Sequence, residues 1–190
     1  DVYKRQPVDI WLSTTYARAG EGGTGAAKCG GNYAASMIAQ TEGEKHGCKQ
    51  VIFKDPHRGD AIEELGGMNV FFVFGKENKI VTPELTGTIL EGVTRSSLIQ
   101  LAKDRGMTVE ERAITLNEWR EGVANGDITE IFACGTAAVV APIGKLKAED
   151  FEIPAPTEHF GEISKSLREE LVGIQLGTVE DRHGWMTRLI

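Results

Sequence analysis

One lysine lies in an unusually glycine-rich stretch near the start of the chain. The segment GGTGAAKCGGNY, Gly22 to Tyr33, surrounds Lys28 with five glycines. A nucleotide-binding P-loop requires a glycine directly before its lysine and a serine or threonine directly after it. Lys28 instead follows Ala27 and precedes Cys29. Because both diagnostic positions differ, the pattern does not favour a P-loop.

A lysine can also act as a nucleophile, because its deprotonated amine forms a Schiff base with a carbonyl compound. Glycines on both sides of Lys28 would let the backbone approach a flat cofactor closely. Tyr33 follows five residues later, in the first turn of an expected helix, so its phenol could reach a group near Lys28. The alternative is a solvated loop lysine and a packed tyrosine. These residues alone leave both interpretations open.

Two further segments contain groups that could act on a bound molecule. In EELGGMN, the adjacent Glu63 and Glu64 point to opposite faces if the segment is extended, and the alternative is a solvated strand end. The segment GVTRSSLIQLAKDRG predicts a helix that begins directly after Gly92, with Thr94 or a neighbour as its N-cap. The free N–H groups at such a helix N-terminus favour an anion.

Hydrophobic periodicity predicts the elements that would position these groups. The run Val70–Phe74 is apolar throughout and rich in β-branched and aromatic residues, which indicates a central strand covered on both faces. Other expected strands lie at 8–13, 49–55, 61–67, 107–114 and on both sides of a Gly-Thr turn in 128–143, with a loop-rich hairpin at 144–159; helices are expected at 32–45, 92–106, 116–126 and around 163–174. This irregular mixture predicts an α+β or irregular α/β domain.

Composition limits the function classes. The chain has 190 residues, 41% of them hydrophobic, which suits one domain or at most two small ones. A formal charge of −7 without a basic block argues against nucleic-acid binding. The three cysteines and four histidines show no disulfide framework and no metal-ligand spacing. The longest apolar run is too short to span a bilayer, so a soluble, cytoplasmic protein is expected.

Four segments in order resemble the branched-chain amino-acid aminotransferases, which are fold-type IV enzymes that use pyridoxal 5'-phosphate. They are GGTGAAKCGGNYAAS, IEELGGMNVFFV, TPELTGTILEGVTRSSLIQLA and EIFACGTAAVVAPI. The resemblance implies that residues 7–190 form the family's C-terminal large domain, an α+β fold with an α/β pseudo-barrel. The small N-terminal domain is expected to be absent from this chain, and residues 1–6 to be a non-native scar.

The resemblance also implies roles at the cofactor ring. Lys28 matches the lysine that holds the cofactor as a Schiff base and later moves a proton as general acid and base. Tyr33 matches the tyrosine that donates a hydrogen bond to the phenolic oxygen of the cofactor. Of the two adjacent carboxylates, the family pattern selects Glu64 as the partner of the ring nitrogen, which it keeps protonated.

At the other end of the cofactor, the resemblance implies a phosphate site. The N–H groups of Val93 and Thr94, the Thr94 hydroxyl and Thr136 would bind the phosphate. The Ala137 N–H and Gly67 would contact the substrate.

The implied reaction is transfer of an amino group from leucine, isoleucine or valine to 2-oxoglutarate. The full-length protein is expected to be a homodimer, and this chain alone to have little or no activity, because the substrate pocket of the family needs both domains and a neighbouring subunit. A D-amino-acid aminotransferase or an aminodeoxychorismate lyase of the same fold is the close alternative. A non-catalytic module, in which Lys28 contacts an anion, is the alternative from another class.

Overall fold

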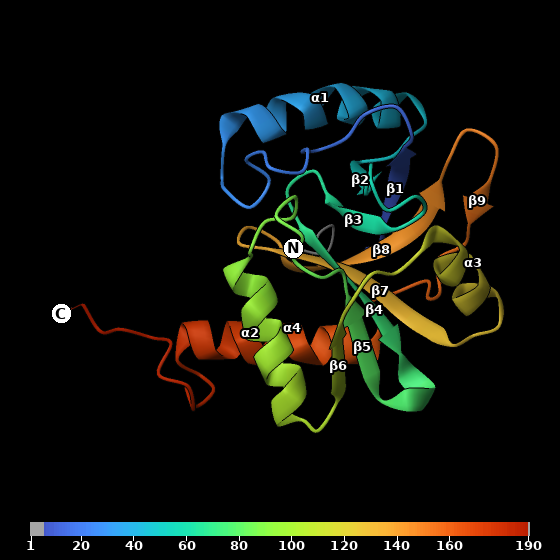
Figure 1. Ribbon diagram of the computed structural model, residues 1–190. Helices are drawn as coiled ribbons and strands as arrows, with labels where there is room; N and C mark the ends of the chain where they lie inside the picture. Colours follow the sequence, from blue (N-terminus) through green and yellow to red (C-terminus); the bar gives the residue numbers. More distant parts are fainter. Residues whose placement is uncertain (1–5, 190) are drawn as a thin grey trace.

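The structure is a computed structural model that describes residues 6–189 (Figure 1). Residues 1–5 of the expected non-native segment lie outside the described residues, and Gln6 lies exposed just before the first strand. Within the described range, nine strands form one mixed sheet in the order β3-β2-β1-β8-β7-β4-β5-β6, with β9 paired to β8. The strands are β1 (Val8–Ser13), β2 (Gln50–Lys54), β3 (Ile62–Leu65), β4 (Asn69–Phe74), β5 (Lys79–Thr82), β6 (Thr108–Glu111), β7 (Ile128–Gly135), β8 (Val139–Lys147) and β9 (Glu152–Ile153).

The sheet is mixed, and it curves into a partial barrel. β1 runs parallel to both β2 and β8, and β5 runs parallel to β6, whereas the other pairs are antiparallel. The two edges approach each other, because the Ile62 N–H of β3 donates to the Ile114 carbonyl just beyond β6, at 2.8 Å. A bridge between Ala61 and Thr115 adds to this contact. The expected α+β fold with a pseudo-barrel is therefore confirmed.

Among residues 6–189, four α-helices cover the curved sheet, and a short 3-10 turn, η2 (Gly75–Glu77), lies between β4 and β5. They are α1 (Gly30–Lys45), α2 (Val93–Asp104), α3 (Leu116–Ala124) and α4 (Glu162–Leu176). In Figure 1, α1 covers β1 and β2 at the top of the view, whereas α2 and α4 cross each other at the lower left, away from α1. The expected helices are thus confirmed, although α1 begins two residues earlier than Asn32.

The central strand β4 connects the two main parts of the hydrophobic core. Its six residues are all buried, as the sequence predicts. Val70 and Phe72 point into the curved interior with Trp119 of α3, and the Phe72 and Trp119 rings meet edge to face at 5.0 Å. Phe71 points the other way, toward the helices, and its ring stacks on that of Phe132. Alternating side chains therefore fill both layers from a single strand.

The start of α2 differs in detail from the prediction. The helix does begin directly after Gly92, but Gly92 itself is the N-cap, without a side-chain cap hydrogen bond. Of the expected candidates, Thr94 or a neighbour, Thr94 is not the N-cap, because it lies inside the helix. A Cβ on residue 92 would overlap the side-chain oxygen of Asn69. The close approach of β4 thus requires glycine where a capping side chain would otherwise lie.

A carboxylate from the sheet caps the last helix. Glu130 of β7 is buried and accepts hydrogen bonds from the Ile163 N–H at 2.9 Å and from the Ser164 N–H at 2.8 Å. The Ser164 hydroxyl donates to the same carboxylate at 2.6 Å. These donors are among the N–H groups that an α-helix leaves unpaired at its start. Glu130 therefore fixes α4 onto the sheet.

We expect Glu130→Ala to lower the free energy of unfolding by about 2–4 kcal/mol, because it leaves buried donors without an acceptor. Urea denaturation would measure this change. Glu169→Ala is the matched control, since Glu169 lies exposed on the same helix with only a 4.0 Å pair to Lys165, and we expect it to cost less than about 0.5 kcal/mol. Equal effects of the two substitutions would contradict the role of Glu130.

Candidate active site

Groups from four separate parts of the chain line one cavity of about 200 Å³. Six of the eight predicted site residues line it: Lys28, Glu64, Gly67, Val93, Thr94 and Thr136. The other lining residues are Met68, Asn69, Leu90, Glu91, Gly92, Cys134 and Gly135. The fold therefore brings together a lysine, a buried carboxylate, a helix N-terminus and a strand turn.

The remaining two predicted residues, Tyr33 and Ala137, lie beside the cavity without lining it. Tyr33 is half-buried on α1, and its Cε1 atom is 3.9 Å from the position that a Cβ on Gly67 would take. Ala137 is exposed in the turn between β7 and β8, directly after Thr136. Tyr33 thus lies next to Gly67, which lines the cavity, and Ala137 lies next to Thr136, which also lines it.

Lys28 is exposed, and the backbone before it is held by a buried side chain. Asn32 of α1 donates from Nδ2 to the Ala27 carbonyl at 3.0 Å and to the Thr24 carbonyl at 2.8 Å. The Ala27 N–H in turn donates to the Thr24 carbonyl. These bonds fix the turn from which Lys28 projects.

The glycine-rich segment lies directly on the loop between β5 and α2. The Ala26 N–H donates to the Gly87 carbonyl at 3.0 Å. A Cβ on Gly25 would overlap the Thr88 backbone. Glycine at position 25 is therefore required by close contact between two backbones, and this contact brings Lys28 to the same cavity as the α2 N-terminus.

Glu64 is fully buried and hydrogen-bonded through both oxygens. Its Oε1 accepts from Arg18 Nη2 at 2.6 Å and from the Leu90 N–H at 2.8 Å, and its Oε2 accepts from Asn69 Nδ2 at 3.1 Å. Burial raises the pKa of Glu64 to about 7, although Arg18 and the Leu90 N–H favour the charged form. Glu64 therefore exchanges a proton near neutral pH, and Oε2 keeps more free acceptor capacity than Oε1.

Glu63 has a different environment from its neighbour. It does not line the cavity, and it accepts a hydrogen bond from the Thr88 hydroxyl, while its Oε2 has no partner among the described residues. Burial raises the pKa of Glu63, although the Thr88 hydroxyl opposes this effect. The alternative of a solvated strand end is wrong for both carboxylates, because both are buried.

Arg18 is the important residue that sequence reasoning missed. It is buried, and its Nη2 also lies 2.7 Å from the Gly25 carbonyl and 2.6 Å from the Thr88 carbonyl. One guanidinium therefore joins Glu64, the glycine-rich segment and the loop before α2. No local signal could have identified it, because a single arginine in STTYARAG matches no motif.

The α2 end of the cavity can bind an anion. In the part of the chain that the structure describes, the N–H groups of Val93 and Thr94 have no acceptor. Thr136 lies on the facing turn. Three residues later, Val139 has φ 59°, which is rare for a β-branched side chain. Such strain is concentrated at functional sites, which agrees with the position of this turn beside the cavity.

Comparisons with known proteins agree with this geometry. Residues 6–146 match the model of the amino-transferase class IV family. The chain is 53% identical over 186 residues to a branched-chain-amino-acid aminotransferase of Mycolicibacterium smegmatis, covering 97% of this chain and 50% of that protein. It is 47% identical over 180 residues to a probable branched-chain-amino-acid aminotransferase of Staphylococcus aureus strain N315, covering 95% and 50%.

Solved structures show the same relationship. The branched-chain amino acid aminotransferase of Escherichia coli has a TM-score of 0.80 at 30% identity, covering 97% of this chain and 56% of that one. The branched-chain aminotransferase of the thermophilic archaeon Thermoproteus uzoniensis, solved with norvaline, has a TM-score of 0.81 at 28% identity, covering 97% and 56%. The chain thus spans about half the length of the curated relatives that it matches.

Glu64 makes the stability of the chain depend on pH. Its pKa is about 7 in the folded state against an ordinary value of 4.5. The folded state therefore binds more protons between these values, and its free energy of unfolding falls as the pH rises. We expect Glu64→Gln to remove this slope, so that the difference between parent and variant changes by about 3 kcal/mol between pH of about 4 and 8.

Urea denaturation at the two pH values would measure this difference. Glu91→Gln is the control, because Glu91 lines the same cavity but is exposed. A parent-to-Glu64→Gln difference that does not change with pH would contradict the raised pKa.

Proposed function

Because this chain belongs to the amino-transferase class IV family, we propose that it is the catalytic part of a branched-chain amino-acid aminotransferase. The reaction moves an amino group between leucine, isoleucine or valine and 2-oxoglutarate. The observation that carries the proposal is the single cavity that contains Lys28, Glu64 and the N-terminus of α2. The names of the relatives support the choice of substrates.

The residues present fit pyridoxal 5'-phosphate as the cofactor. This molecule has an aldehyde, a ring nitrogen and a phosphate, and the cavity offers an amine, a carboxylate and free N–H groups. Its volume of about 200 Å³ is below the roughly 300–1,000 Å³ of pockets for drug-sized ligands, which agrees with a single flat ring. When bound, pyridoxal 5'-phosphate supplies an electron sink for the carbanion of the amino acid.

Lys28 and Glu64 have complementary tasks in this proposal. When the cofactor is bound, the Lys28 amine would hold its aldehyde, and the same amine would serve as the acid and base that carries a proton. Glu64 would hold the ring nitrogen through Oε2, because Arg18 and the Leu90 N–H occupy Oε1. Exclusion of water around Glu64 strengthens its interaction with a protonated nitrogen.

The other predicted residues hold the ends of the two bound molecules. Tyr33, which lies beside the cavity on the Gly67 side, would donate a hydrogen bond from its phenol to the ring oxygen of the cofactor. Val93, Thr94 and Thr136 would bind the phosphate, for which the helix N-terminus is well suited. The Ala137 N–H and Gly67 are left for the substrate; both lie at the edge of the same cavity or beside it.

We also propose how this chain contributes to the whole protein. Residues 7–190 would be the large domain, and a small N-terminal domain would complete the apolar pocket for the substrate in a cytoplasmic homodimer. The half-length match to the relatives supports this arrangement. Across residues 6–189, none of the helices has the length and apolar character needed to cross a membrane.

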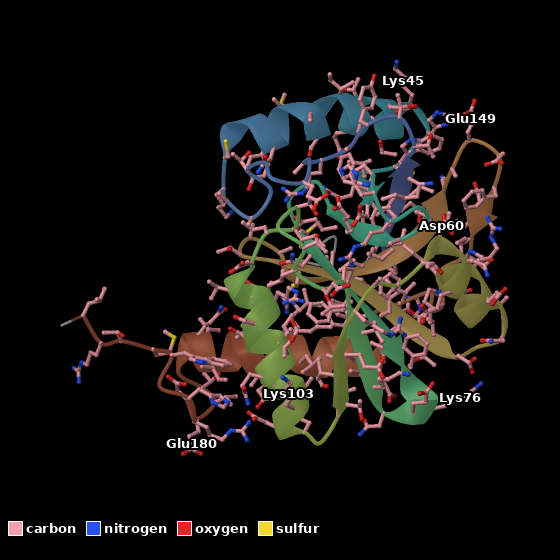
Figure 2. All side chains as sticks on the ribbon, viewed as in Figure 1. Lys45, Asp60, Lys76, Lys103, Glu149 and Glu180 are labelled. Carbon is pink, nitrogen blue, oxygen red and sulfur yellow. The ribbon has the colours of Figure 1, made fainter. Side chains whose placement is uncertain are left out.

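Reduction with borohydride after mixing with pyridoxal 5'-phosphate tests the covalent role of Lys28. We expect a stable adduct on the peptide that contains Lys28, detected by peptide mapping, and its loss in Lys28→Ala. Lys45→Ala is the control, because Lys45 lies at the end of α1 and points away from the molecule (Figure 2). If the full-length protein gave no adduct, Lys28 would be a structural or anion-binding lysine.

Substrate trials on the full-length protein test the reaction. We expect turnover of leucine, isoleucine and valine with 2-oxoglutarate, and a loss of at least about 10³-fold in kcat for Lys28→Ala, because the covalent holder and proton carrier are removed together. Coupled detection of glutamate would measure both. Strong turnover of D-alanine without turnover of leucine would instead identify a D-amino-acid aminotransferase.

A further inference from the structure

Arg95, in the first turn of α2, is a buried cation outside the set of residues proposed to bind the cofactor or the substrate. Its side chain is only 4% exposed. Its Nη2 donates to the Pro83 carbonyl at 3.0 Å and to Glu111 Oε2 at 2.9 Å. Its Nε is buried and has no partner among the described residues. Arginine is rarely buried so completely unless it is paired.

The local electrostatics make this position unfavourable for a cation. The N-terminus of a helix already carries a partial positive charge, and the first turn of α2 contains no acidic residue. The partner carboxylate on Glu111 is 42% exposed, so solvent weakens the pair. An apolar side chain of similar volume would fill the same space at a lower electrostatic cost. A buried positive charge is thus kept here without a buried counter-charge.

The cavity lies next to this charge. Gly92, Val93 and Thr94 line the cavity, and Arg95 follows them directly, with its Cβ 3.4 Å from the position that a Cβ on Gly92 would take. Arg95 does not line the cavity itself.

The charge of Arg95 acts on groups that line the cavity. Burial raises the pKa of the Cys134 thiol, and Arg95 acts in the opposite direction. Burial also raises the pKa of Glu64, and Arg95 is one of the cations that oppose it. The guanidinium therefore contributes positive potential inside the cavity without contact.

The other charges in the cavity do not cancel this potential. The buried carboxylate on Glu64 is paired with Arg18, and Glu91 is exposed to solvent. Glu111, the partner of Arg95, is exposed as well. At the α2 end of the cavity the buried groups are thus the guanidinium of Arg95 and the helix N-terminus, so a bound anion would meet a positive potential.

We propose that Arg95 is a positioning residue for a doubly charged phosphate group at the N-terminus of α2. Its hydrogen bonds fix the first turn of α2 to Pro83 and Glu111. Its positive charge attracts the anion at the N-terminus of α2 electrostatically, without direct contact. The inference rests on the proposed function only in taking the anion to be the phosphate of the cofactor. Its direct test uses inorganic phosphate and needs no covalent chemistry.

The experiment is a phosphate titration of the chain at constant ionic strength and at a pH of about 8, followed by NMR at the Val93 and Thr94 amides. We expect Arg95→Met to weaken phosphate binding about tenfold or more, and Arg95→Lys to weaken it clearly less, since lysine keeps the charge although it lacks the planar guanidinium. Arg105→Met is the matched control, because Arg105 forms an ion pair with Glu170 at the opposite end of the same helix. It should leave phosphate binding unchanged.

A further variant separates the charge from the contacts. Glu111→Gln removes the carboxylate and leaves Arg95 in place, so phosphate should bind at least as tightly as to the parent. Weaker binding in Glu111→Gln, equal losses in Arg95→Lys and Arg95→Met, or no phosphate response at Val93 and Thr94 in the parent would each overturn the proposal. If Arg95→Met fails to fold, Arg95→Lys and Glu111→Gln still test the proposal, because both variants keep a positive charge at position 95.

Failure of the inference about Arg95 can be distinguished from failure of the proposed function. Phosphate binding that depends on Arg95, together with no borohydride-reduced adduct on Lys28 in the full-length protein, would contradict the proposed function alone. An adduct on Lys28 with phosphate binding that does not depend on Arg95 would contradict the inference about Arg95 alone.

Discussion

The buried ion pair between Arg18 and Glu64 is the constraint on which the site depends. Removing Glu64 would leave the Arg18 guanidinium charged in a region without water, which costs several kcal/mol. The same guanidinium is bonded to the carbonyls of Gly25 and Thr88. This single side chain therefore fixes three parts relative to one another: the glycine-rich segment, the Glu64 carboxylate of β3 and the loop before α2.

The curved sheet makes this arrangement possible. β4 is buried on both faces, and at its first residue Asn69 donates to both Glu64 and the Leu90 carbonyl. The side-chain oxygen of Asn69 also leaves no room for a side chain at Gly92, the N-cap of α2. One amide thus links the carboxylate to the helix end, so that the two ends of the cavity are held at a fixed separation.

Charge balance connects the geometry of the cavity to its chemistry. Glu64 keeps a pKa of about 7 because burial outweighs the effect of Arg18, so its proton can be shared with a ligand near neutral pH. The opposite end combines a helix N-terminus with the buried Arg95. A ligand with a basic ring and a remote anionic group matches both ends, which is the chemical form of the cofactor proposed.

The sequence by itself determined most of the elements, although not β5, because apolar periods, glycines and caps depend on neighbouring residues. Those local patterns predicted the start of α2 after Gly92, whereas the choice of Lys28 and Glu64 as site residues came from the resemblance of four segments to a family. Only the tertiary structure decided that Arg18 joins them, that Gly92 and not Thr94 caps α2, and that Tyr33 and Ala137 stand beside the cavity. Arg18 and Thr88 are 70 residues apart. Such contacts form because the curved sheet brings backbones that are distant in the sequence close together in space. No local sequence pattern encodes these contacts.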